Sequence, residues 1–307
     1  MIFMKYRKIL LLVIMSSVTY LFPRTAGEST LLKSKTTNPK IKLNNKAHGY
    51  ALGLQAAIIL GGIYFWNYSE RWTGEFAIEN EGWFREDSYN GGADKLGHVY
   101  TWSLLTRALI HNYERNGFSR KASAFWGFTI PAVNGVFIEL LDGYTTYNAS
   151  TEDILSNLAG SGLGLFLYLH PKLDETINLS WSYLPSSDFK KNVKPDFTTD
   201  YAGQVFTFEV NGNGLRKVLG QQRPLVTDYL QVGLSYYSRG YSGESGTNKQ
   251  RFMGVTLGIN FQQFFKKGSS ARTFAKYFQL PYSYGGYYKE LNSNKKQFIY
   301  GKDIYNY

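Results

Sequence analysis

The chain has 307 residues, enough for one large domain or two ordinary ones, and carries a formal net charge of +11. It contains no cysteine, so we expect no disulfide, no thiolate metal site, no cysteine nucleophile and no acyl anchor on a lipobox cysteine. Its basic residues are scattered and no aromatic-basic RNA motif is present, so nucleic acid is not an expected partner. Aromatic residues make up 17% of the chain, a bias found at membrane interfaces and in the strands of envelope proteins.

Residues 1–27 have the pattern of a secretory signal peptide. Lys5, Arg7 and Lys8 form a basic start, and a largely apolar run follows from Ile9 to Phe22. The residues after this run fit a cleavage site imperfectly, so a cleaved signal and an uncleaved anchor both stay open. We expect export, with the protein in the periplasm or associated with the outer membrane.

Residues 28–46 are polar and basic and indicate a linker, and residues 47–171 predict a helical bundle of about four helices. The predicted helical segments are Ala51–Trp66, Asp94–Asn112, Lys121–Leu141 and Thr151–His170. The first is an almost continuous apolar run, shorter than the roughly 20 residues that span a bilayer comfortably. A buried core helix and a short helix in the inner membrane both fit this run.

Two serines and a long loop mark the boundaries of these helices. Ser119 and Ser150 stand where N-caps are needed. Asn67–Gly92, between the first two helices, is acidic and aromatic and predicts a long ordered loop. Loops of this length in compact domains are often functional, but a surface excursion held in place by its aromatic residues fits this segment better.

After Pro171 the hydrophobic pattern changes to period two, which predicts an antiparallel β region over residues 172–265, with the first strand near Thr176. Leu230, Val232, Leu234 and Tyr236 share one face of a strand, and the odd-numbered residues of Met253–Phe261 share one face of another. The hydrophilic segment between them predicts a hairpin. Residues 266–307 indicate a basic, tyrosine-rich tail. The expected fold class is therefore α+β.

Three polar clusters lie on the otherwise apolar helical segments. Their members are spaced three or four residues apart, which places them on one face of a helix. The clusters are Asp94, Lys95 and His98, then Glu139 and Asp142, then Asp153 and Asn157. Gly160 and Gly164 extend the third face as a GxxxG step, which allows a neighbouring helix to approach closely. We predict that the three clusters meet in the folded interior.

Several roles remain open for such a cluster. In one, His98, Asp94, Glu139 and Asp153 are candidate ligands of a divalent metal whose bound water performs a hydrolysis. In another, Lys95 and His98 neutralise the carboxylates in a buried network that stabilises the bundle. A polar ligand-binding pocket is a third. A single histidine is fewer than a transition-metal site usually has, which favours the buried network of Lys95, His98 and the carboxylates.

No catalytic residue can be assigned from sequence motifs. Nucleophile-elbow, P-loop and dinucleotide-binding signatures are missing, and the glycine-rich run at Gly160–Gly164 lies inside a helical pattern. Whether the protein is an enzyme stays undecided. No cofactor is implied apart from the candidate divalent metal.

The motifs resemble those of a known family. GWFREDSYNGGADKLGH (Gly82–His98), IELLDGY (Ile138–Tyr144) and STEDILSNLAGSGLG (Ser150–Gly164) look like the YfiM-like family of predicted periplasmic or envelope lipoproteins. The similarity continues through the β region to Tyr284, and the helical half is more distantly similar to VanZ-like membrane proteins. The resemblance implies export, an envelope location and the seven cluster residues as motif positions, but no established activity. This chain departs from the family pattern by lacking the lipobox cysteine.

We therefore expect an exported, envelope-associated membrane protein with a structural or binding role. The expected partner is membrane lipid or another envelope component, and no protein partner can be named. The alternative is a metal-dependent hydrolase acting on lipid or another envelope substrate. A small outer-membrane β-barrel is a third hypothesis, although four recognisable strands fall short of the roughly eight that a closed barrel needs.

Overall fold

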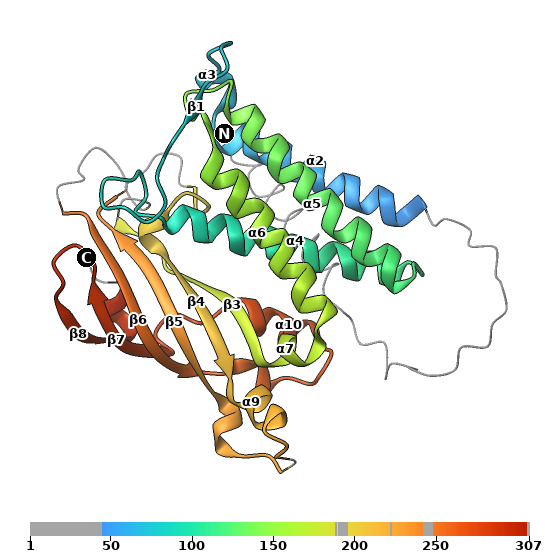
Figure 1. Cartoon of the computed structure of the whole chain (residues 1–307), viewed down its shortest axis with the longest axis vertical. Helices are drawn as coiled ribbons and strands as arrows, with labels where there is room; N and C mark the ends of the chain where they lie inside the picture. The colour runs from blue at the N-terminus through green and yellow to red at the C-terminus, as the bar shows by residue number, and fades with distance from the viewer. Residues whose placement is uncertain (1–44, 188, 190–195, 222, 242–247, 306–307) are drawn as a thin grey trace, which may run out of the picture.

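The structure is a computed structural model, and it describes residues 45–187, 189, 196–221, 223–241 and 248–305. The expected signal peptide (1–27) and nearly all of the expected linker (28–46) lie outside these residues. In the described part a layer of long helices packs against one antiparallel six-stranded sheet (Figure 1). The predicted α+β class is confirmed.

Four long helices form the helical layer, and a short helix, α3 (Tyr68–Arg71), follows the first. They are α2 (Asn45–Phe65), α4 (Ala93–Arg115), α5 (Arg120–Asp142) and α6 (Thr151–Leu169). The side chains of Ser119 and Ser150 accept hydrogen bonds from the backbone of the first turns of α5 and α6, as an N-cap requires. By length and composition α2 and α5 could each cross a membrane, with 22% and 39% of their apolar windows buried.

Glycines allow α4 and α6 to pack closely. A Cβ atom on Gly160 would lie 2.4 Å from the carbonyl oxygen of Val99, and one on Gly164 would lie 2.6 Å from that of Ser103. Only glycine leaves room for the α4 backbone at these two positions. The predicted GxxxG contact is therefore made, and it brings the polar faces of the two helices together.

The loop between α3 and α4 is tied to the end of the helical layer. Its two-residue strand β1 (Ile78–Glu79) pairs in parallel with β2 (Ala149–Ser150), which directly precedes α6. Trp72 and Thr145 form a further isolated bridge. The first part of the loop, residues 72–79, therefore lies beside the segment that leads into α6.

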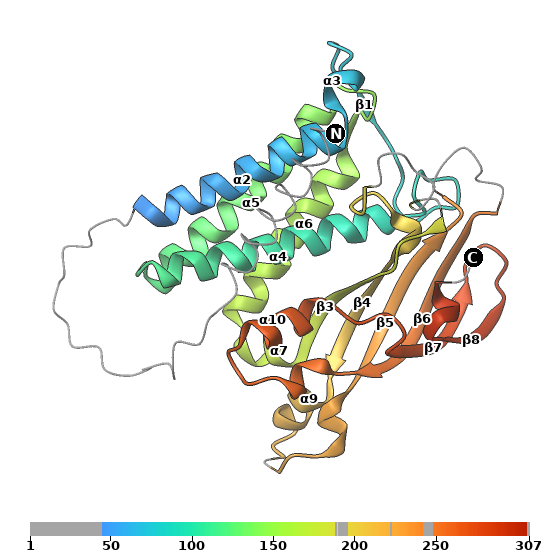
Figure 2. The ribbon, with the colours of Figure 1, turned by 180° about the vertical axis from the view of Figure 1, so that it is seen from behind.

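The sheet is an antiparallel meander in the order β3-β4-β5-β6-β7-β8 (Figure 2). Its strands are β3 (Ile177–Tyr183), β4 (Gln204–Asn211), β5 (Leu230–Arg239), β6 (Gln250–Ile259), β7 (Tyr284–Glu290) and β8 (Lys296–Tyr300). The short helices α7 (Pro171–Thr176), α9 (Gly212–Val218) and α10 (Ser270–Tyr277) lie at its edges and ends.

The prediction of a basic tail over residues 266–307 was wrong for most of that segment, which contributes α10, β7 and β8. Strand β7 contains Gly285 and Gly286, which lower the intrinsic strand propensity, and β8 has only five residues. Pairing with β6 and with each other, rather than local sequence preference, makes these segments strands.

Two apolar clusters hold the sheet together. One lies on the inner side of the sheet, opposite the helical layer, where Tyr237, Phe252 and Tyr288 pack with Ile304. The other joins the sheet to the helical layer through Tyr100 of α4, Leu179 of β3 and Phe206 of β4. Helix α4 therefore contacts the sheet directly and carries the first polar cluster.

Candidate functional site

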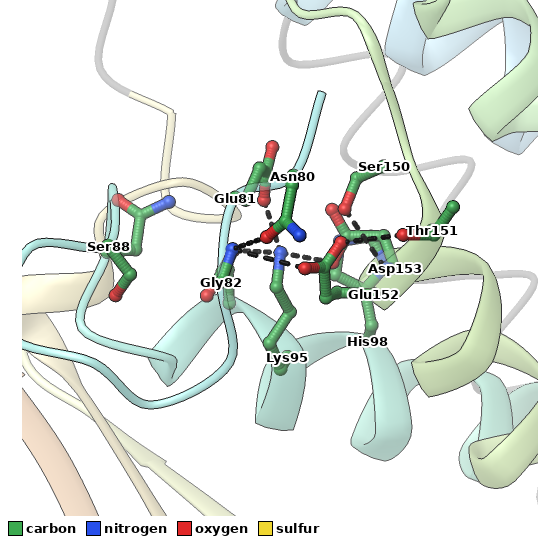
Figure 3. Close-up of polar contacts among 12 residues, drawn as sticks. Asn80, Glu81, Gly82, Ser88, Lys95, His98, Ser150, Thr151, Glu152 and Asp153 are labelled. Carbon is green, nitrogen blue, oxygen red and sulfur yellow. Dashed lines mark hydrogen bonds and ion pairs between the residues drawn. The ribbon is translucent and has the colours of Figure 1, made fainter. Parts of the chain in front are cut away.

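The structure brings the three polar clusters to one end of the helical layer. The first halves of α4 and α6 meet the last turns of α5 there. The loop before α4 lies against α4 and α6, with Glu81 facing Lys95 and Gly82 facing Glu152 (Figure 3). Five of the seven predicted residues are almost completely buried: Asp94, Lys95, Glu139, Asp153 and Asn157. His98 keeps 26% of its side chain exposed, and Asp142 lies at the edge of the cluster.

Lys95 is the cationic centre of the first half of the site. Its side chain is 2% exposed, and its Nζ lies 2.8 Å from both Asp94 Oδ2 and Asp153 Oδ1. It also donates to Glu81 from the loop (Figure 3). Burial alone would lower the pKa of Lys95, but the charges of Asp94, Asp153 and Glu81 outweigh burial and raise it. Lys95 therefore keeps its positive charge in the interior.

His98 is held in one orientation by Asn157. Asn157 Nδ2 donates to the backbone oxygen of Gly135 at 3.1 Å and to Glu139 Oε1 at 3.2 Å, which fixes the amide orientation. Asn157 Oδ1 must then be an acceptor, so His98 Nδ1 is protonated and donates to it at 2.7 Å. The other ring nitrogen, Nε2, faces Asp153 Oδ1 at 3.4 Å.

The carboxylates around His98 favour its protonated form. Burial lowers the pKa of His98, but the charges of Asp153, Glu139 and Asp94 outweigh it and raise the pKa to about 9. Asp153 lies between His98 and Lys95, and these two cations overcome its burial and lower its pKa. An imidazolium donating from Nε2 to Asp153 is the form that these charges stabilise.

Glu139 and Asp142 bind protons more readily than ordinary carboxyls. Burial raises the pKa of Glu139 to about 8 against the opposing charge of His98. Burial also raises the pKa of Asp142 to about 6, although the hydroxyl of Tyr68 donates to its carboxylate. Asp142 makes this contact with Tyr68 from α3 rather than with Lys95, so it belongs to the periphery of the site.

Two acidic residues that no helical pattern indicated, Glu81 and Glu152, complete the site. Glu81 contacts Lys95, and burial together with the charge of Asp153 raises its pKa to about 7. Glu152 accepts from the backbone nitrogen of Gly82 at 3.2 Å and so anchors the loop on α6 (Figure 3). The acidic character of the loop was visible in the sequence, but a loop has no periodicity from which the inward-facing residue could be chosen.

The loop also connects the site to the sheet. Tyr236 of β5 donates to the backbone oxygen of Gly91, and Ser238 Oγ donates to that of Asn90 at 2.9 Å. Tyr241 donates to the backbone oxygen of Glu86 at 3.1 Å. The loop is thus bound to Lys95 through Glu81 and to the sheet through residues 86–91.

Two groups of side chains within the described residues have the geometry to surround a cation. Glu81, Asp94 and Asp153 form one, and His98, Glu139 and Asp153 form the other, with ligand atoms within 4.8 Å of one another in each. The ammonium of Lys95 already contacts all three carboxylates of the first group. In the second group Glu139 lies on the Nδ1 side of the imidazole and Asp153 on the Nε2 side, so one metal ion requires His98 to turn.

Apart from Glu152, which binds the backbone of the loop, the site holds five carboxyl groups against two cations, Lys95 and His98. The carboxyls belong to Glu81, Asp94, Glu139, Asp142 and Asp153. Buried charge without compensation is costly, and burial accordingly raises the pKa of Glu81, Glu139 and Asp142, which favours their protonated, neutral forms. This arrangement can bind protons or a further cation, and it can immobilise the elements that meet there.

The fold and the site together define an α+β protein in which a helical layer with a buried charged cluster packs on an antiparallel sheet. Residues 80–169, which contain all seven predicted site residues, match a family described as predicted periplasmic lipoprotein (DUF2279). The protein is exported and has a periplasmic or envelope-associated location. No curated protein and no solved structure matches the chain.

Proposed function

We propose that the protein has a structural or binding role in the cell envelope, and that its charged cluster fastens the helical layer to the sheet. One observation carries this proposal: the chain's own ammonium group, on Lys95, occupies the position among Glu81, Asp94 and Asp153 where a bound cation would lie. Membrane lipid or another envelope component is the proposed partner.

The loop contacts explain how such a cluster acts structurally. Lys95 binds Glu81 and Glu152 binds Gly82, so the loop is held from both α4 and α6. The following residues of the loop accept hydrogen bonds from Tyr236 and Ser238 of β5. Loss of the cluster therefore removes the support of this connection between the two halves.

The matched family supports the envelope role at a coarse level. We also propose, from the segments Gly82–His98, Ile138–Tyr144 and Ser150–Gly164, that the protein is related to the YfiM-like family and more distantly to VanZ-like proteins. Both agree with a protein whose polar motif positions stabilise a fold rather than display a nucleophile.

Unfolding measurements test the structural role. Glu139→Ala leaves Asn157 Nδ2 with one partner fewer and an interior gap, so we expect a loss of about 2–3 kcal/mol in the free energy of unfolding. Glu70→Ala, at an exposed glutamate of α3, is the matched control and should change it by less than about 0.5 kcal/mol. Equal effects of the two substitutions would refute the proposal.

A divalent metal bound by His98, Glu139 and Asp153 is the second candidate, because their ligand atoms lie within 4.8 Å of one another. A metal there would supply Lewis-acid chemistry for the alternative function, hydrolysis of lipid or another envelope substrate. This candidate predicts that Zn²⁺ or Mn²⁺ raises the melting temperature of the wild-type protein and leaves that of His98→Ala unchanged. The structural proposal predicts no metal-dependent shift in either protein.

A further inference from the structure

The helical layer packs on one face of the sheet over β3 and the start of β4, and beyond it the same face, the outer face, presents apolar side chains to solvent. Most of the exposed outward-facing residues of five strands are large and aliphatic or aromatic, and Val255 is 60% and Phe298 69% exposed. This apolar face comprises Phe208, Leu230, Val232, Leu234, Met253, Val255, Leu257, Ile259, Tyr287, Phe298 and Tyr300.

The inner face of the same strands is rich in polar side chains. Glu209 is buried there and accepts from Ser180 Oγ at 2.8 Å, with Asn178 and Gln231 as further donors. Thr207 and Ser235 share a hydrogen bond of 2.7 Å beside them. A sheet with one face in water normally shows the reverse pattern, apolar inside and polar outside. Apolar-out and polar-in alternation is the pattern of strands that face lipid.

The apolar face is continuous across the strands and long in the strand direction. One row runs across five strands, from Phe208 through Leu234, Val255 and Tyr287 to Phe298, because these residues are cross-strand partners in register. Along β6 the outward residues extend from Met253 to Ile259, about 20 Å at roughly 3.4 Å per residue. That length exceeds the thickness of one hydrocarbon leaflet, about 15 Å.

Lysines border the apolar face. Lys289 and Lys296 are exposed cross-strand partners directly beside the row of Tyr287 and Phe298. Like charges opposite each other on neighbouring strands destabilise a sheet unless an anion lies near them. In the described strands β5 to β8, no outward-facing position carries Asp or Glu. At the far end of β6, exposed Lys266 follows the exposed aromatics Phe264 and Phe265.

We propose that this face binds an anionic lipid bilayer, with its apolar rows in the acyl chains and Lys289 and Lys296 at the phosphate headgroups. Lysine stems lie along apolar surface while their ammonium groups reach the interface, and each contributes electrostatic attraction to anionic lipid. The proposal depends on the envelope location and is independent of the role of the charged cluster.

Site-specific labelling tests the orientation of the bound protein. Since the chain has no cysteine, Val255→Cys in the full chain gives a single attachment point for an environment-sensitive fluorophore. We expect its emission to shift to shorter wavelength with vesicles containing phosphatidylglycerol, and much less with pure phosphatidylcholine. The matched control is Leu155→Cys on α6, at an apolar residue of similar exposure. A shift at residue 155 without one at residue 255 would overturn the proposal.

Binding measurements separate lipid from other occupants. Val255→Glu should lower partitioning into phosphatidylglycerol vesicles at least about tenfold, while Leu155→Glu should not. Replacing Lys289 and Lys296 with glutamine should lower it about fivefold per lysine and weaken its salt dependence. A lipid-free dimer that Val255→Glu dissociates, together with absent vesicle binding, would assign the face to a second copy of the chain. A monomer without vesicle binding would refute the proposal outright.

Discussion

Replacing Lys95 with methionine removes the ammonium that binds Glu81, Asp94 and Asp153 while keeping a side chain of similar length. The side chain is 2% exposed and two of its contacts measure 2.8 Å, so the carboxylates lose a buried and closely placed partner. Removing one member of a buried ion pair costs about 3–5 kcal/mol. We expect Lys95→Met to lower the free energy of unfolding by about 4 kcal/mol at pH 7, measured by urea denaturation.

The same substitution at an exposed ion pair provides the control. Lys217 contacts Glu175 at 2.6 Å, but the two side chains are 46% and 41% exposed, so Lys217→Met should cost less than about 1 kcal/mol. Adding Asp153→Asn to Lys95→Met should restore part of the loss, because one uncompensated charge disappears. The cost of Lys95→Met should also be smaller at pH 5, where protons neutralise part of the orphaned charge. A cost no larger than that of Lys217→Met would refute the reasoning.

Two further substitutions test the packing and the interior of the sheet. Gly160→Ala places a Cβ atom 2.4 Å from the carbonyl oxygen of Val99, so it should lower the melting temperature and the free energy of unfolding, the latter by about 1–3 kcal/mol. The control is Gly162→Ala, whose Cβ atom would meet nothing within 4 Å and which should preserve or raise the melting temperature. Burial raises the pKa of Glu209 from 4.5 to about 8, so its stabilising contribution is complete below pH 4.5 and is lost as the pH rises through about 8. Between pH 5 and pH 9 the wild type should therefore lose several kcal/mol of unfolding free energy that Glu209→Gln keeps, as measured by urea denaturation at both pH values. A difference between the two proteins that is the same at pH 5 and pH 9 would contradict this.

The hairpin of β5 and β6 shows how far hydrophobic periodicity can be used. Alternation predicted which residues share a face and that the two strands pair, and the register places Leu230 opposite Ile259 and Leu234 opposite Val255. Periodicity could not show whether that face is buried. A period-two pattern has the same form whether the apolar side packs on a core or points outward, and here it points outward.

The strands of the C-terminal segment show the opposite limit. Strand β7 has the sequence YGGYYKE, and its outward residues are a glycine, a tyrosine and a lysine. No local preference for a strand is strong in such a segment. Its partners Gly254–Gly258 in β6 and Tyr300 in β8 determine its conformation, and such long-range pairing cannot be read from a local pattern.

Helical spacing indicated most of the site because α-helices place residues at i, i+3 and i+4 on one face. Asp94 and His98 on α4, and Asp153 and Asn157 on α6, do face each other across the close helix contact made by Gly160. The loop residue Glu81 could not be found in this way. Its place beside Lys95 follows from the β1–β2 pairing, which involves only two residues from each segment.

The loop that Lys95 fixes also covers part of the outward side of the sheet. Tyr236 stands on the same side of β5 as Leu234, yet it is buried, because Phe84 packs against its ring and Gly91 accepts from its hydroxyl. Lys95 and Glu152 hold this loop together with hydrogen bonds from the sheet, and its complete detachment would uncover Tyr236 and extend the apolar face by one position along β5. The charged cluster therefore limits how much apolar sheet surface is exposed, and this connects the stability of the helical layer to the surface that we assign to lipid.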